Sequence, residues 1–143
     1  MSTFVLERAR VAPASTELVG LVPVSLHADV RRVAAGLRIR VELSDAVGLV
    51  AARIESRCPE IVLVDTDLLG CPGGLCRLAR SLRPEVQFVG LACSWSKRET
   101  MLRECADVIV HKPIRDAEWT ALFGRLGVVD ITKTVAHTPN LAA

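Results

Sequence analysis

The stretch Ile61-Val62-Leu63-Val64-Asp65 is apolar for four residues and then ends in a carboxylate. A strand that is apolar at every position is typical of a parallel sheet covered on both faces, so we predict that it is central. The stretch Val108-Ile109-Val110-His111-Lys112-Pro113 has a similar design, with an ammonium near its end. Ligands of open α/β sheets bind at the carboxyl ends of the strands. We therefore expect Asp65 and Lys112 to meet at one edge of the sheet.

The composition fits a single α/β domain. The chain has 143 residues, of which 50% are hydrophobic and only 3% aromatic, with no tyrosine. Its core must therefore consist of Val, Leu, Ile and Ala, as in parallel sheets packed between helices. The net charge of +2 is too small to indicate a nucleic-acid-binding protein.

Neither a membrane nor a secreted protein is indicated. No apolar stretch reaches the roughly 18 residues of a membrane span, and residues 1–10 lack a signal-peptide pattern. We expect a cytoplasmic protein without membrane contacts. The odd number of cysteines and the lack of a CxxC spacing argue against disulfides and zinc, and favour small buried hydrophobic residues. The cysteines are Cys58, Cys71, Cys76, Cys93 and Cys105.

Apolar runs of strand length alternate with segments of helical period along the chain, which is typical of repeated βαβ units. The predicted strands are Leu18 to Val24, Leu37 to Leu43, Ile61 to Val64, Val86 to Cys93 and Val108 to Val110. The predicted helices are Ala28 to Leu37, one capped by Ser44, one containing Leu75 to Leu82, one opened by the Ser96–Glu99 capping box, and one capped by Asp116. The inward residues expected on these helices include Val30, Val47, Val50, Ile54, Leu75, Leu78, Leu82, Trp119, Leu122 and Phe123.

Five strands that are each followed by a helix predict an α/β fold: a single flavodoxin-like (βα)5 doubly wound parallel sheet of order 2-1-3-4-5. We expect the strand that ends in Asp65 to be central and the strand that ends in Lys112 to be its neighbour.

From about Leu18 to Gly127 the chain resembles the receiver domain of bacterial two-component response regulators. The run from Pro59 to Gly70 is similar to the family's strand that ends in the phosphoacceptor aspartate and continues toward a Pro-Gly turn. The run from Glu104 to Pro113 is similar to its Ala-Gly-Ala-Asp, apolar strand and Lys-Pro. We therefore divide the chain into an N-terminal extension at 1–16, a receiver-like domain at 17–127 and a flexible C-terminal tail at 128–143.

The resemblance assigns roles to three residues. Asp65 is the candidate phosphoacceptor, Lys112 is the receiver-like lysine, and Pro113 is a candidate cis-proline, since X-Pro is where a cis peptide bond is energetically accessible. The alternative for Asp65 and Lys112 is a structural ion pair in which each charge offsets the desolvation of the other.

Two parts of the family's apparatus do not match. The family has an acidic pair at the end of the first strand that binds Mg²⁺, and the matching positions here are Ser25 and Leu26. Its switch hydroxyl after the fourth strand falls at Ala92, or at Cys93 in a shifted register. The resemblance therefore indicates a pseudo-receiver with no metal site and no cofactor, and Mg²⁺ would be needed only if phosphorylation occurs.

We expect a stand-alone pseudo-receiver signalling protein that is not an enzyme and acts through protein–protein interaction, independently of phosphorylation. The family often binds partners or dimerises through its fourth helix, fifth strand and fifth helix. The predicted interaction surface therefore contains Arg98, Arg103, Glu104 and Trp119. Two alternatives stay open: a genuine phospho-accepting response regulator that uses Asp65, and a small-ligand or redox-sensing module with Cys93 as its reactive thiol.

Overall fold

The computed structural model describes residues 16–69, 72–93, 103 and 105–126. Five parallel strands form one sheet in the order β2-β1-β3-β4-β5, which confirms the predicted flavodoxin-like topology. The strands are β1 (Thr16–Leu21), β2 (Ile39–Ser44), β3 (Ile61–Asp65), β4 (Gln87–Cys93) and β5 (Val108–Lys112). The helices with described bounds are α2 (Val24–Ala35), α3 (Val47–Arg57), α4 (Gly73–Leu82) and α6 (Asp116–Arg125).

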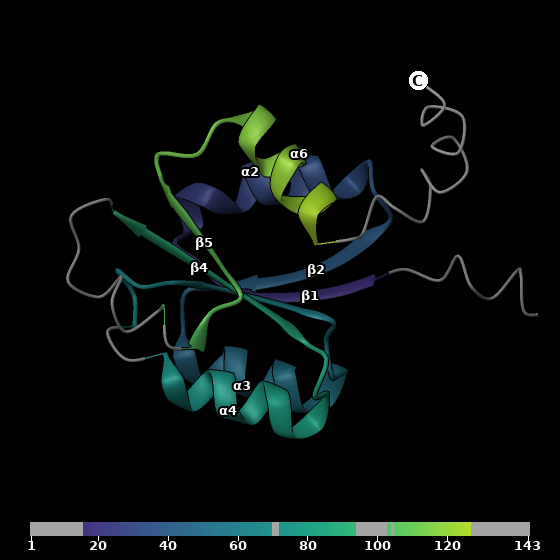
Figure 1. The fold of residues 1–143 in the computed structure, drawn as a ribbon, viewed down its shortest axis with the longest axis vertical. Helices are drawn as coiled ribbons and strands as arrows, with labels where there is room; N and C mark the ends of the chain where they lie inside the picture. Colours follow the sequence, from purple (N-terminus) through teal and green to yellow (C-terminus); the bar gives the residue numbers. More distant parts are fainter. Residues whose placement is uncertain (1–15, 70–71, 94–102, 104, 127–143) are drawn as a thin grey trace, which may run out of the picture.

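The sheet lies between two layers of helices. Helices α2 and α6 cover one face, and α3 and α4 cover the other (Figure 1). Because alternate residues of a strand point to opposite faces, each strand supplies both cores. Leu63 packs in the cluster that contains Val30 and Trp119, whereas Val62 packs in the cluster that contains Ile54 and Leu75.

Strand β3 is central, as its sequence predicts. All five of its residues are buried, since β1 and β4 pair with its two sides and helices cover both faces. Asp65 is the last residue of β3, so its side chain is buried at the end of the sheet where the parallel strands have their carboxyl ends.

The first strand ends earlier than predicted. It stops at Leu21 rather than Val24, because Pro23 has no N–H for the β ladder and instead precedes helix α2. The N–H of Val22 still donates to Ser44, at 3.0 Å. Ser25 and Leu26 consequently lie in the first turn of α2 and not at the end of a strand.

The two predicted helix caps are also displaced. Ser44 is the last residue of β2, and Ala46 is the N-cap of α3; the Ser44 hydroxyl accepts a hydrogen bond from the Ala46 N–H at 3.0 Å. Asp116 is the first residue of α6, and Arg115 is its N-cap. The Arg115 N–H donates to Glu118 Oε1 at 2.7 Å, which ties the start of the helix to its first turn.

The predicted inner faces of the helices are correct at their centres and wrong at some ends. Val50, Ile54 and Leu75 are buried. Val47, the first residue of α3, is 37% exposed, and Leu82, the last residue of α4, is 41% exposed. The cysteine prediction is correct for Cys76, which is 3% exposed, and wrong for Cys93, which is exposed at the end of β4.

Several predicted features lie outside the described residues. They are residues 1–15 of the extension predicted at 1–16, the tail at 128–143, the capping box from Ser96 to Glu99, and the positions of Cys71, Arg98 and Glu104. Residue 16, the last of the predicted extension, is the first residue of β1. Within the described part of the chain, no helix has the length and apolar character needed to cross a membrane.

Candidate functional site

Asp65 and Lys112 meet as predicted, although their strands are not neighbours. Strand β4 lies between β3 and β5, so the expected adjacency is wrong. Residue 65 pairs with Leu91 on β4, and Lys112 pairs with Cys93 two residues further along the same strand. The long lysine side chain crosses the end of β4, and Nζ lies 3.1 Å from Asp65 Oδ1 and 2.8 Å from Oδ2.

The Asp65 carboxylate is fully enclosed. Its exposed fraction is 0%, and that of the Lys112 side chain is 18%. The N–H of Asp67 donates to Oδ1 of Asp65 at 2.8 Å, which closes a turn directly after β3. A buried carboxylate is tolerated only when it is paired and hydrogen-bonded, and here both of its oxygens have donors.

Asp67 is a member of the site that sequence reasoning missed. Its side chain is 43% exposed and accepts a hydrogen bond from Lys112 Nζ, so one ammonium is shared by two carboxylates. The available signal was its position two residues after Asp65. When an aspartate at a strand end accepts a hydrogen bond from the second following N–H, the chain turns, and that second residue stays close to the aspartate.

The charge of Lys112 is stabilised by this arrangement. Burial lowers the pKa of Lys112, but hydrogen bonds and attraction from Asp65 and Asp67 outweigh it, so the pKa is raised above its usual value. The ammonium therefore stays charged well above neutral pH and neutralises much of the negative charge at the site.

The region beside Asp65 provides few metal ligands. The residues that follow β1 are Val22 and Pro23, whereas Ser25 and Leu26 lie in the first turn of α2, and none of the four carries a carboxylate. Among residues 16–69, 72–93, 103 and 105–126, no three His, Cys, Asp or Glu side chains gather as metal ligands. A hard divalent cation prefers several oxygen ligands, so the described residues do not fit the Mg²⁺ that this fold family implies.

Cys93 rather than Ala92 reaches the site at the end of β4. Ala92 is fully buried, whereas Cys93 stands opposite Lys112 in the ladder. Its Sγ lies 3.8 Å from Asp67 Oδ2. Of the two residues predicted for the switch position, the one beside the charged cluster therefore carries an exposed thiol and no hydroxyl.

The remaining site predictions have mixed outcomes. The peptide bond between Lys112 and Pro113 is cis, as predicted. Arg103 is exposed. The prediction that Trp119 belongs to the interaction surface is wrong. Its side chain is 0% exposed and stacks on Phe123 in the core between α6 and the sheet. A tryptophan on the apolar face of a helix is more often a core residue than an interface anchor.

No family model and no curated protein matches this sequence, but many solved structures share its fold. NtrX from Brucella abortus in complex with ADP matches 90% of this chain and 29% of its own, with 18% identity and a TM-score of 0.66. A CheY-like response regulator receiver domain protein from Methanospirillum hungatei matches 79% of this chain and 94% of its own, with 19% identity and a TM-score of 0.66. The chemotaxis response regulator CheY4 of Vibrio cholerae matches 79% of this chain and 98% of its own, with 14% identity and a TM-score of 0.68. The chain therefore has the fold of response-regulator receiver domains.

Proposed function

We propose that this protein is a pseudo-receiver: a signalling protein that binds a protein partner through the receiver fold, without catalysis and without phosphorylation. The observation that carries the proposal is the state of Asp65. Its carboxylate is buried and held by Lys112 and by the Asp67 N–H. In this role the ion pair between Asp65 and Lys112 connects the carboxyl ends of β3 and β5 and stabilises the fold.

The chemistry of phosphoryl transfer supports this proposal. An aspartate attacking a phosphoryl group needs a divalent cation to neutralise the oxygens that gather around phosphorus. In the part of the chain that the structure describes, Asp67 is the second carboxylate beside Asp65, and Lys112 already contacts it. Val22 and Pro23, on the other side, contribute no acidic side chain. A phosphoryl donor would have to break the hydrogen bonds of a buried carboxylate without a cation to replace them.

Phosphorylation of Asp65 is the second candidate, because Asp65 and Lys112 are both retained and in contact. Acetyl phosphate or beryllofluoride with Mg²⁺ separates the two candidates, and intact mass or amide shifts near Asp65 report the outcome. A pseudo-receiver gives neither an adduct nor a shift. Asp65→Asn is the control for modification at other carboxylates. A stoichiometric adduct that is lost in Asp65→Asn would contradict the proposal.

The surface that binds the partner includes Arg103, which is exposed in the described part of the chain. We expect Arg103→Glu, combined with Arg98→Glu, to abolish capture of the partner by the tagged protein. Asp65→Asn keeps the same size and the hydrogen bond from Asp67, so capture should continue with this variant. If Asp65→Asn abolishes capture and the arginine variants do not, the charged site and not the helix surface recognises the partner.

A further inference from the structure

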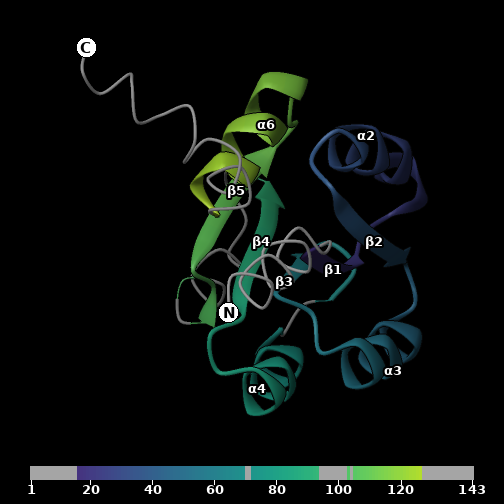
Figure 2. The same cartoon turned by 90° about the vertical axis from the view of Figure 1, so that its right-hand side faces the viewer.

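Strand β2 is an edge of the sheet with an open side. It pairs with β1 alone in the part of the chain that the structure describes, and Figure 2 shows it at the margin between α2 and α3. Thr16 N–H donates to Arg38 O, and Val22 N–H donates to Ser44 O. In a parallel ladder the backbone groups of alternate residues point to the same side. The N–H and C=O groups of Ile39, Val41 and Leu43 therefore point to the open side.

We propose that β2 pairs antiparallel with β2 of a second copy of this chain, around a two-fold axis at Val41. This register places Ile39 opposite Leu43 of the second copy and Val41 opposite its own equivalent. All three residues direct their backbone groups outward, so they form hydrogen-bonded pairs across the axis. Two five-stranded sheets would then join into one continuous sheet, which is an isologous contact that closes on itself as a dimer.

The charges of β2 fit this register. Arg40 lies opposite Glu42 of the second copy, and the symmetry repeats the pair on the other side of the axis. These are non-hydrogen-bonded positions, where facing side chains come closest, so the opposite charges attract. Arg40 is 61% exposed and Glu42 is 30% exposed. Within the chain Arg40 also pairs with Glu17, at 3.3 Å. Glu42 pairs with Arg53 at 3.2 Å and with Arg57 at 2.9 Å, so a contact between the two copies would add to these ion pairs.

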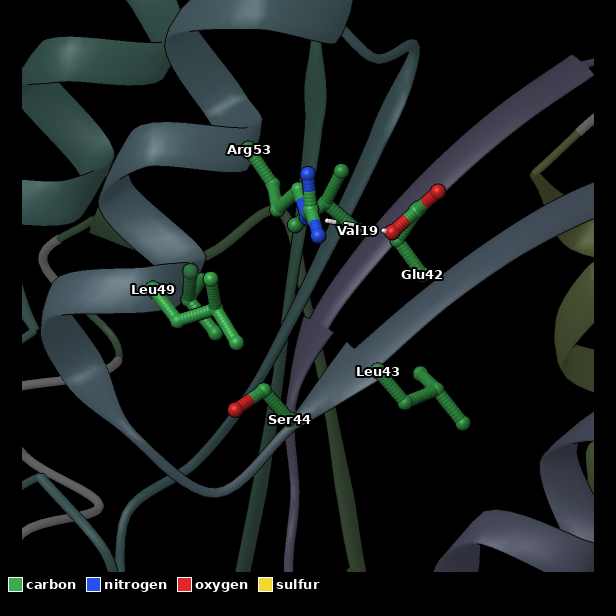
Figure 3. A pocket seen from close by; sticks show the side chains of 7 residues that line it. Val19, Glu42, Leu43, Ser44, Leu49 and Arg53 are labelled. Atoms are coloured by element: carbon green, nitrogen blue, oxygen red, sulfur yellow. Dashed lines mark ion pairs between the residues drawn. The ribbon is translucent and has the colours of Figure 1, made fainter.

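Helix α3 contributes apolar surface beside β2. Leu49 of α3 is 46% exposed and lines a hollow together with Glu42, Leu43 and Ser44 of β2. Figure 3 shows Glu42 and Arg53 pointing toward each other beside Leu49, in the hollow between β2 and α3. A second sheet edge placed here would cover Leu49, which otherwise faces water.

The other edge strand, β5, does not show this complementarity. Antiparallel pairing centred on Val110 would place Ile109 opposite His111, and Val108 opposite Lys112, so no opposite charges meet. The self-complementary charge pattern therefore selects β2 as the edge that pairs with a second copy.

The oligomeric state of the full chain tests this inference, measured by sedimentation velocity over a wide concentration range. We expect a monomer–dimer equilibrium. Arg40→Glu places two acids opposite each other twice per dimer and should raise the dimer Kd about tenfold or more. Val41→Pro removes an outward N–H that β1 does not use and should prevent dimerisation, whereas Val41→Thr keeps the N–H and should preserve it.

A mixing experiment identifies the register. Arg40→Glu makes both facing positions acidic, and Glu42→Arg makes both basic, so each variant alone should be monomeric. Mixed together, they should form a heterodimer that native mass spectrometry separates by mass. Far-UV circular dichroism checks the fold of each variant. If Glu42→Arg does not fold, Arg40→Glu and Val41→Pro still test whether the dimer forms through β2. A monomer at every concentration, or a dimer unaffected by Arg40→Glu and Val41→Pro, would overturn the inference.

Discussion

Replacing Lys112 by methionine tests whether the charged site maintains the fold. The substitution keeps a long apolar side chain and removes the ammonium that lies 2.8 Å from Asp65 Oδ2. Asp65, with 0% exposure, would then retain only the hydrogen bond from Asp67 N–H. Removing one partner of a buried ion pair costs about 3–5 kcal/mol. Because Lys112 is 18% exposed, we expect a loss near the lower limit, about 3 kcal/mol.

Urea unfolding followed by tryptophan fluorescence and circular dichroism measures this loss. For a domain of this size the urea dependence is about 2 kcal/mol per molar, so the unfolding midpoint should fall by about 1.5 M. Arg32→Met is the matched control. Arg32 pairs with Asp29 and Asp116 but is 53% exposed, so its loss should lower the stability much less than the loss of Lys112 does.

The double variant Asp65→Asn with Lys112→Met separates charge burial from packing. It removes both charges of the buried pair and leaves no buried carboxylate without its ammonium, so it should be more stable than Lys112→Met alone. The reasoning is refuted if Lys112→Met costs no more than Arg32→Met, or if the double variant recovers nothing.

The remaining predictions concern pH, a thiol and two glycines. The pKa of Lys112 is raised on folding, so its stabilising contribution is complete below the unfolded pKa of about 10.4 and is lost as the pH rises through the folded pKa. In urea titrations above a pH of about 10.4, the difference in the free energy of unfolding between wild type and Lys112→Met should therefore shrink. Cys93 should react stoichiometrically with a thiol reagent in the folded protein, and Cys93→Ser should change stability by less than about 0.5 kcal/mol because the side chain is exposed; an unreactive thiol would exclude the redox alternative. Gly20→Ala should lower stability by about 1 kcal/mol, since its Cβ would lie 2.9 Å from Leu43 Cδ2. Gly48→Ala, on helix α3 with no atom within 4 Å of the new Cβ, should instead raise the thermal midpoint by an amount that corresponds to about 0.5–1 kcal/mol.

Strand composition predicted more of this protein than any other signal. The continuous apolar run Ile61–Asp65 predicted a central strand, and this prediction is confirmed. Local chemistry was a weaker guide to boundaries. Pro23 ended the first strand early because it cannot join the ladder, and Asp116 lies just inside α6, where it pairs with Arg32 at 2.6 Å.

The sequence by itself determined the class of fold, the order of its elements and the placement of an acid and a lysine at carboxyl ends of strands, because burial and period are properties of short segments. Only the tertiary structure decided that Lys112 crosses the end of β4 to reach Asp65, that Asp67 shares its ammonium, and that Cys93 stands beside them. These contacts depend on the register between strands far apart in the chain, and a shift of one residue would turn each side chain to the opposite face.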